Sequence, residues 1–218
     1  MFKVIRNILI CLILGLGVFF GLQWKNYQAK AQYRQDALLY FHEEDYQKAI
    51  SYLEEGLDKM SFFGQDMDQD MSCYLGESYY QLGEYDQAVE IYDQLIVDDS
   101  KTKMFYFLKA EACEAQGEHE KAVEVLQMGW EKTEDSVFLT RICDSYIAAE
   151  DYEKALSYAQ KGAEAEDENS ADFLYKEIVI YEKCQDYQSA YAVATKYVSL
   201  YPDDEKGVKE LTFLSTRI

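Results

Sequence analysis

Residues 75–92 have the sequence LGESYYQLGEYDQAVEIY, in which small residues alternate with tyrosines at helical spacing. Gly76 lies three residues before Tyr79, and Ala88 lies four residues before Tyr92. Residues three or four apart share one face of a helix. The stretch therefore predicts two helices that approach closely at the small residues, so that an aromatic ring of one fills the space beside the other.

The second half of this stretch recurs along the chain. Strings similar to YDQAVEIYDQLI begin at residues 46, 85, 119, 152 and 187, and each carries an alanine three residues later. These alanines are Ala49, Ala88, Ala122, Ala155 and Ala190, at spacings of 39, 34, 33 and 35 residues. A second apolar-periodic segment precedes each copy, and Gly83 and Gly117 mark the turn between the two segments in two copies. Five units of helix, turn and helix are predicted, each too small to bury its apolar face unless it stacks on its neighbours.

An acidic residue stands just before the second helix of every unit. These residues are Asp45, Glu84, Glu118, Asp151 and Asp186. Each is expected to cap free N–H groups at the helix start and to meet the positive end of the helix dipole.

The pattern L-G-x-x-Y, followed by A-x-x-x-[FY] and a closing proline, resembles the tetratricopeptide repeat. The matching residues of the second copy are Leu75, Gly76, Tyr79, Ala88 and Tyr92, and Pro202 matches the closing proline of the fifth. The usual leading tryptophan is absent, with Ser72 in its place. The resemblance implies an all-α fold, a right-handed α-solenoid of about five helix hairpins over residues 30–202. Residues 203–218 are expected to form a C-terminal capping helix, with Val208, Leu211 and Leu214 on its apolar face.

Residues 1–29 are predicted to form a short basic tail and a membrane-spanning signal-anchor helix. Residues 8–24 carry no charge and would span about 25 Å as a helix, with Trp24 closing the run at the interface. The alternative is a cleaved signal peptide, with an Ala29-x-Ala31 site, which would release a secreted binding module. The short tail places the remainder of the chain on the extracytoplasmic side. Gly17 and Gly21 have the spacing that would let two anchors pack into a dimer.

The charge of the chain limits its partners. The 218 residues carry a formal net charge of −20, and no Asp or Glu occurs before Asp36. A surface of this sign repels nucleic-acid phosphates, so nucleic acid is not an expected partner.

The sequence offers no assembled chemistry, and no catalytic, cofactor or metal site is predicted. It contains no GxGxxG, P-loop or HExxH motif. The five cysteines are scattered singly, as expected of small buried apolar residues rather than of a disulfide framework or a zinc site. Asp66, Asp68, Asp70 and Glu77 have the spacing of a calcium loop, but Met71 replaces the required glycine. The repeat register places residues 70–82 on a helix, which would spread the carboxylates, so an acidic loop leading into a helix is expected instead.

The resemblance implies that a peptide segment of another protein lies in a concave groove lined by the first helix of each hairpin. The predicted groove residues are Arg34, Tyr74, Glu77, Tyr80, Phe107, Glu111, Glu114, Arg141, Asp144 and Tyr175. Chaperone-binding relatives hold a terminal carboxylate with a basic cluster, whereas here Glu77, Glu111 and Asp144 recur at one position. The expected partner therefore presents a basic or aromatic-containing segment, and the expected function is a membrane-tethered scaffold without catalysis.

The first two copies are separated by about five extra residues, within DKMSFFGQDMDQD. Phe62 and Phe63 in this insertion are expected to pack against the repeats, because two exposed phenylalanines are costly. The alternative is that they are exposed and contact a partner.

Overall fold

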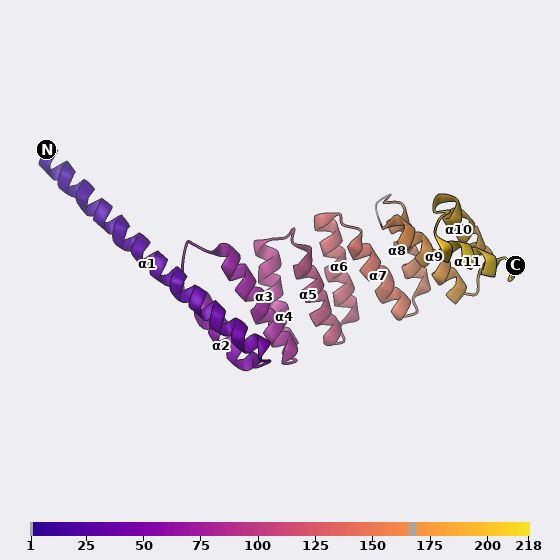
Figure 1. Ribbon diagram of the computed structural model, residues 1–218, viewed down its shortest axis with the longest axis horizontal. Helices are drawn as coiled ribbons and strands as arrows, with labels where there is room; N and C mark the ends of the chain where they lie inside the picture. The colour runs from indigo at the N-terminus through magenta and orange to yellow at the C-terminus, as the bar shows by residue number, and fades with distance from the viewer. Residues whose placement is uncertain (1, 166–168) are drawn as a thin grey trace. The chain divides into compact units, whose positions relative to one another are not determined.

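The computed structural model describes residues 2–165 and 169–218, and these residues form eleven α-helices and no strand (Figure 1). The helices are α1 (Phe2–His42), α2 (Tyr46–Leu57), α3 (Gln65–Gln81), α4 (Tyr85–Asp98), α5 (Lys103–Ala115), α6 (His119–Thr133), α7 (Val137–Ala148), α8 (Tyr152–Ala163), α9 (Ser170–Lys183), α10 (Tyr187–Leu200) and α11 (Glu205–Leu214). The predicted all-α class is confirmed. Residue 1 of the predicted tail and residues 166–168 of the predicted repeat region lie outside the described residues.

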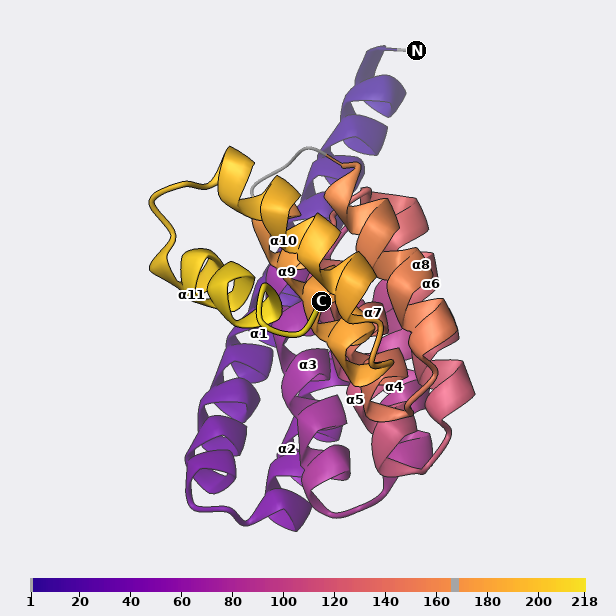
Figure 2. The same cartoon turned by 90° about the vertical axis from the view of Figure 1, so that its right-hand side faces the viewer.

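The helices belong to two compact units. Unit 1 comprises Met1–Asp99 and Glu111–Gly117, and unit 2 comprises Ser100–Ala110 and Glu118–Ile218. In unit 1, α1 packs on α2, α2 on α3, and α3 on α4. In unit 2, α6 packs on α7 and the contacts continue from each helix to the next as far as α11 (Figure 2). Helices that are neighbours in sequence are thus neighbours in space within each unit, as expected of stacked hairpins.

The apolar N-terminal run and the first helix of the first repeat form one unbroken helix, α1, of 41 residues. Its N-terminal part is long and apolar enough to cross a membrane, with a mean hydropathy of 1.5, and is exposed in the structure. The predicted boundary between residues 29 and 30 therefore marks a change in composition within one helix. A Cβ atom added at Gly17 or Gly21 would meet no atom within 4 Å, and close packing of two anchors stays a prediction.

The turns between paired helices share one backbone geometry. In each, one residue adopts the left-handed conformation with φ between 58° and 79°, namely Glu44, Gly83, Gly117, Glu150 and Gln185. After α7, the N–H of Glu150 donates to the carbonyl of Ile147 at 3.1 Å, and the N–H of Asp151 donates to that of Tyr146 at 2.9 Å. This Schellman pattern satisfies carbonyls that the helix end leaves free. Glycine adopts it without steric cost, which is why the sequence marked two of the turns plainly.

The predicted N-caps divide into two groups. The aspartates each accept a hydrogen bond from the backbone N–H three residues later, and they are Asp45, Asp151 and Asp186. Side-chain and backbone hydrogen bonds from those partner residues hold the pKa of all three carboxyls below the ordinary 3.8. Glu84 and Glu118 also stand at the N-cap, but neither makes the predicted capping bond. The longer Glu118 side chain instead accepts from the Lys121 ammonium at 2.7 Å.

The alternation of small and aromatic residues has the predicted packing role. The recurring alanines are all fully buried: Ala49, Ala88, Ala122, Ala155 and Ala190. Between α3 and α4, a Cβ atom added at Gly76 would lie 2.5 Å from Cε1 of Tyr92, which is only 1 % exposed. The absence of a side chain at Gly76 therefore makes room for the Tyr92 ring.

The same size complementarity joins consecutive repeats. A Cβ atom added to a glycine of the second helix would overlap a large side chain of the next helix at three junctions. The pairs are Gly56 with Met71, Gly129 with Phe138, and Gly162 with Phe173. At the last junction the earlier helix carries the large residue and the later helix the glycine, since Gly207 of α11 lies against the ring of Tyr197 in α10. Each of these four junctions therefore has its own matched pair of residues.

The capping helix α11 covers the fifth repeat with a face slightly different from the predicted one. Leu214 is fully buried with Leu174 and Ile178, and Leu211 packs at the edge of this cluster. Val208 is 41 % exposed, so its predicted place on the buried face is wrong. Gly207 takes that place, because only a residue without a side chain fits against Tyr197.

Candidate partner-binding surface

The ten predicted groove residues belong to both units. Unit 1 contains Arg34, Tyr74, Glu77, Tyr80, Glu111 and Glu114, and unit 2 contains Phe107, Arg141, Asp144 and Tyr175. We call Glu77, Tyr80 and Glu111 the acidic surface, and the four residues of unit 2 the mixed surface. Their chemistry differs, and each is described within its own unit.

In the acidic surface, the charges of two carboxylates act on one phenol. Burial first, and then the charges of Glu111, Tyr85 and Glu77, raise the pKa of Tyr80. The Tyr80 ring is held by an edge-on contact with Tyr85, at 5.3 Å between centroids. Glu77 is oriented by Gln81, whose side-chain amide donates to it at 2.6 Å. The arrangement provides negative charge beside an aromatic face, which suits a cationic side chain.

Arg34 and Tyr74 are engaged in packing α3 onto α1. Arg34 Nε donates to Asp70 Oδ2 at 2.6 Å, and both side chains are little more than one-third exposed. The Tyr74 ring meets Phe41 edge-on at 5.1 Å between centroids. These two predicted groove residues therefore hold α3, which carries Glu77 and Tyr80, against α1.

The carboxylates with calcium-loop spacing all lie along α3, which begins at Gln65 and not at residue 70 as predicted, so Asp66 and Asp68 are helical and not in a loop. Asp68 pairs with the buried ammonium of Lys30, and Asp70 pairs with Arg34. Two of these carboxylates thus form ion pairs with cationic side chains of α1. Among the described residues, no group of three or more His, Cys, Asp or Glu could hold a metal ion.

In the mixed surface, Phe107 and Arg141 form an aromatic–cation pair. Phe107 stacks on Phe138 at 4.5 Å between centroids, and the Arg141 guanidinium carbon lies 5.7 Å from the Phe107 centroid. Since Phe138 is fully buried, the Phe107 ring has a rigid support.

Asp144 is paired with the ammonium of a lysine in the next repeat. Its Oδ1 accepts from Lys176 Nζ at 2.5 Å, and Asp172 also lies 3.7 Å from this ammonium. Lys176 is only 17 % exposed, so the pair is held in place. Sequence reasoning missed Lys176, although the repeat register sets it at the position that Arg141 has one copy earlier.

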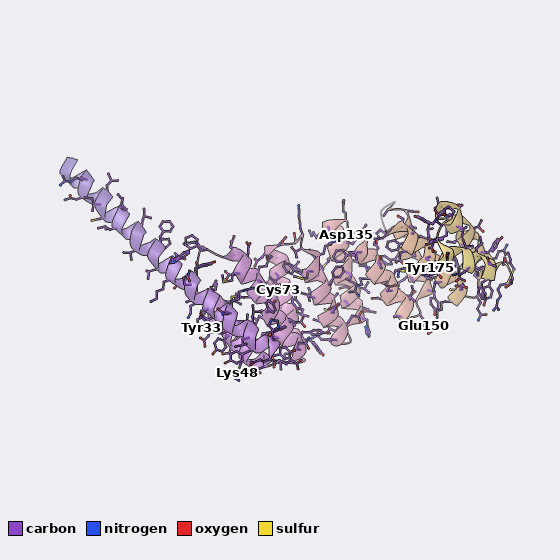
Figure 3. The ribbon with its side chains drawn as sticks, viewed as in Figure 1. Tyr33, Lys48, Cys73, Asp135, Glu150 and Tyr175 are labelled. Carbon is purple, nitrogen blue, oxygen red and sulfur yellow. The ribbon has the colours of Figure 1, made fainter. Side chains whose placement is uncertain are left out.

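Tyr175, labelled in Figure 3, is a residue of α9. A second cation that the sequence did not reveal lies over its ring. Lys206 Nζ lies 3.5 Å from the Tyr175 ring centroid, and the Tyr175 hydroxyl donates to Glu210 at 3.3 Å. Burial and the Glu210 carboxylate raise the pKa of Tyr175 to about 12. These contacts join α9 to the capping helix, so Tyr175 is partly a packing residue.

The cysteines only partly follow the prediction. Cys113 and Cys143 are buried, as expected, and Cys73 is half-buried. Cys184, which was also expected to be buried, is exposed because it lies at the C-terminal end of α9. Burial raises the pKa of the Cys73 and Cys143 thiols to about 11, which makes them poor nucleophiles at neutral pH.

Comparison with protein families identifies the repeat. Residues 75–129, which contain the Gly76–Tyr92 contact and the third repeat, match the tetratricopeptide repeat family. This part of the chain carries tetratricopeptide repeats. No curated protein sequence matches the chain. The repeat fold is typical of protein–protein interaction scaffolds, which are generally not enzymes.

Solved tetratricopeptide repeat proteins share the fold at low sequence identity. A repeat protein from Bacteroides fragilis superposes with a TM-score of 0.60 at 14 % identity, over 87 % of this chain and 99 % of that one. One from Parabacteroides merdae gives 0.59 at 17 % identity, over 87 % and 73 % of the two chains. YrrB, described as having an unusual peptide-binding site, gives 0.53 at 16 % identity, over 88 % and 96 %.

Proposed function

We propose that the protein is a membrane-tethered scaffold that binds a segment of another protein and performs no catalysis. The apolar part of α1 supports the tether, because its large side chains, such as Leu12 and Val18, are more than half exposed. Such a surface is stable in lipid and unfavourable in water. The unbroken course of α1 would carry the repeats directly on the anchor. Tethering confines the scaffold to one surface and raises the effective concentration of partners in the same membrane.

The acidic surface is the proposed binding site for a basic or aromatic-containing segment. The single observation that carries this proposal is that the charges of Glu77, one turn earlier on α3, and of Glu111 both act on the Tyr80 phenol. A lysine or arginine of the partner would meet negative charge and an aromatic face together. The peptide-binding site for which YrrB is described supports the use of this fold to hold a peptide. Asp144 contributes less to this proposal, because Lys176 already neutralises it.

The test uses the full chain in detergent micelles and fluorescent peptides of positive, neutral and negative charge. Changing Glu77→Gln and Glu111→Gln together should weaken binding of the positive peptide and reduce its dependence on salt. Asp144→Asn is the matched control, with the same chemical change at the same repeat position, and should have little effect. Equal binding by the double variant and the wild type would contradict the proposal, as would an equal loss in the control.

The tether itself is tested by N-terminal sequencing of the mature protein. Cleavage after Ala31 would remove Lys30 and leave Asp68 without the ammonium that it binds, which favours an uncleaved anchor. A mature chain that begins near residue 32 would instead identify a secreted module. We further propose that the repeats are extracytoplasmic. A membrane-impermeant reagent should then label a cysteine introduced at residues 203–206 in intact cells.

A further inference from the structure

The loop between α2 and α3 exposes three large apolar side chains next to the predicted membrane span. Met60 is 81 % exposed, Phe62 is 73 % exposed and Phe63 is 37 % exposed. The prediction that both phenylalanines pack against the repeats is wrong. The extra five residues between the first and second copies build this loop, residues 59–64, which has no equivalent elsewhere in the repeat pattern.

The loop follows the surface of α1 towards its N-terminus and then returns. The side-chain amide of Asn26 donates to the Met60 carbonyl at 2.8 Å. The Phe62 ring reaches Phe19, at 5.6 Å between centroids, and the Phe63 ring then meets Trp24 at 6.3 Å. Phe62 is therefore the apex of the loop. It lies against a residue about 7.5 Å further along the helix axis than Trp24, inside the uncharged run.

Side chains satisfy the polar backbone of the loop near its apex. The N–H of Phe62 donates to the Gln23 side-chain oxygen at 2.9 Å, and the N–H of Phe63 donates to the Ser61 hydroxyl oxygen at 3.1 Å. The Ser61 hydroxyl itself donates to the Gln23 carbonyl at 3.3 Å. Irregular backbone can enter an apolar medium only where its hydrogen bonds are supplied internally. The loop combines exposed apolar side chains with acceptors for the backbone N–H groups of Phe62 and Phe63, which lowers the cost of contact with lipid.

We propose that residues 59–64 form a membrane-contacting loop, in which Phe62 enters the bilayer hydrocarbon beside α1 and Met60 and Phe63 lie at its boundary. The proposal rests on the proposed membrane anchor and adds a second contact with the same leaflet. We infer that lipid covers the exposed face of Phe62. The Phe62 ring packs on Phe19, and Phe19 belongs to the part of α1 that would itself lie in lipid. The first acidic residue after the loop is Asp66, at the start of α3, where the chain would leave the membrane surface. With two contacts, unit 1 would have a fixed tilt relative to the membrane.

The test measures the depth of nitroxide labels in the full chain, reconstituted in nanodiscs of phosphatidylcholine and phosphatidylglycerol at one chain per disc. Labels are placed by Leu16→Cys in the anchor, Phe62→Cys in the loop and Val97→Cys, which is 77 % exposed in α4. The exposed Cys11 and Cys184 are first changed to serine. The remaining thiols are buried or half-buried and react slowly. Circular dichroism confirms that each labelled variant is folded.

The expected result is that the ratio of oxygen to nickel-chelate collisions at residue 62 resembles that at residue 16 and exceeds that at residue 97 several-fold. A label at residue 62 that matches residue 97, while residue 16 lies in lipid, overturns the loop proposal and leaves the anchor standing. A label at residue 16 that is open to the nickel chelate overturns the anchor and the loop together. Because each disc holds one chain, shielding at residue 62 that appears only with several chains per disc would identify a second copy as the occupant and overturn the proposal.

Discussion

Replacing Gly76 by alanine tests directly whether the small residues exist to admit aromatic rings. The added Cβ atom would lie 2.5 Å from Cε1 and 2.9 Å from Cζ of Tyr92. Carbon atoms in contact prefer about 3.5–4.0 Å, so the ring or the helix must move by about 1 Å. Tyr92 is only 1 % exposed, and the ring cannot turn out into solvent.

Two opposing effects set the magnitude. Overpacking of this kind costs about 1–3 kcal/mol. Replacing glycine by alanine inside a helix contributes about 1 kcal/mol in the other direction. We therefore expect Gly76→Ala to lower the free energy of unfolding by as much as about 2 kcal/mol. In a Tyr92→Leu background the overlap disappears, and the same change should raise stability by about 1 kcal/mol. That double variant reproduces the pair found one repeat later, where Ala110 and Leu126 have these positions.

The assay is equilibrium urea unfolding of the full chain in detergent micelles, followed by far-ultraviolet circular dichroism. The four proteins of the double-mutant cycle are compared, and the denaturant dependence is checked for a constant slope. The decisive result is a change of sign, with alanine destabilising beside Tyr92 and stabilising beside leucine. An equal effect in both backgrounds would refute the steric explanation of the alternating pattern.

Three further changes should alter stability. Glu150 has a φ of 58°, so Glu150→Gly should raise the free energy of unfolding by about 0.5–1 kcal/mol in urea titrations, whereas the helical control Glu153→Gly should lower it. The buried Tyr92 hydroxyl has no hydrogen-bond partner in the described structure, so Tyr92→Phe should raise it by about 1 kcal/mol, and a loss would contradict this. Burial raises the pKa of Glu177 above 4.5, so ionisation of Glu177 destabilises the fold above that pH. Glu177→Gln should thus raise the melting temperature at pH 7 and not below pH 4.5, and a gain that does not depend on pH would refute this cause.

The sequence by itself determined the helices, the repeat and its register. These features depend on spacings of three or four residues within a helix and on a period of about 34 residues, both visible in a linear chain. The glycines and the aromatic residues that pack against them also recur with that period. For this reason the all-α class and the role of Gly76 beside Tyr92 were predicted correctly.

Tertiary structure decided which charges are neutralised and where the insertion lies. Asp144 binds Lys176, which is 32 residues away in sequence. Phe62 joins Gln23 across 39 residues, and no local pattern indicates that contact. An ion pair or a loop contact depends on distances between helices, and these distances are fixed only when the whole core has packed.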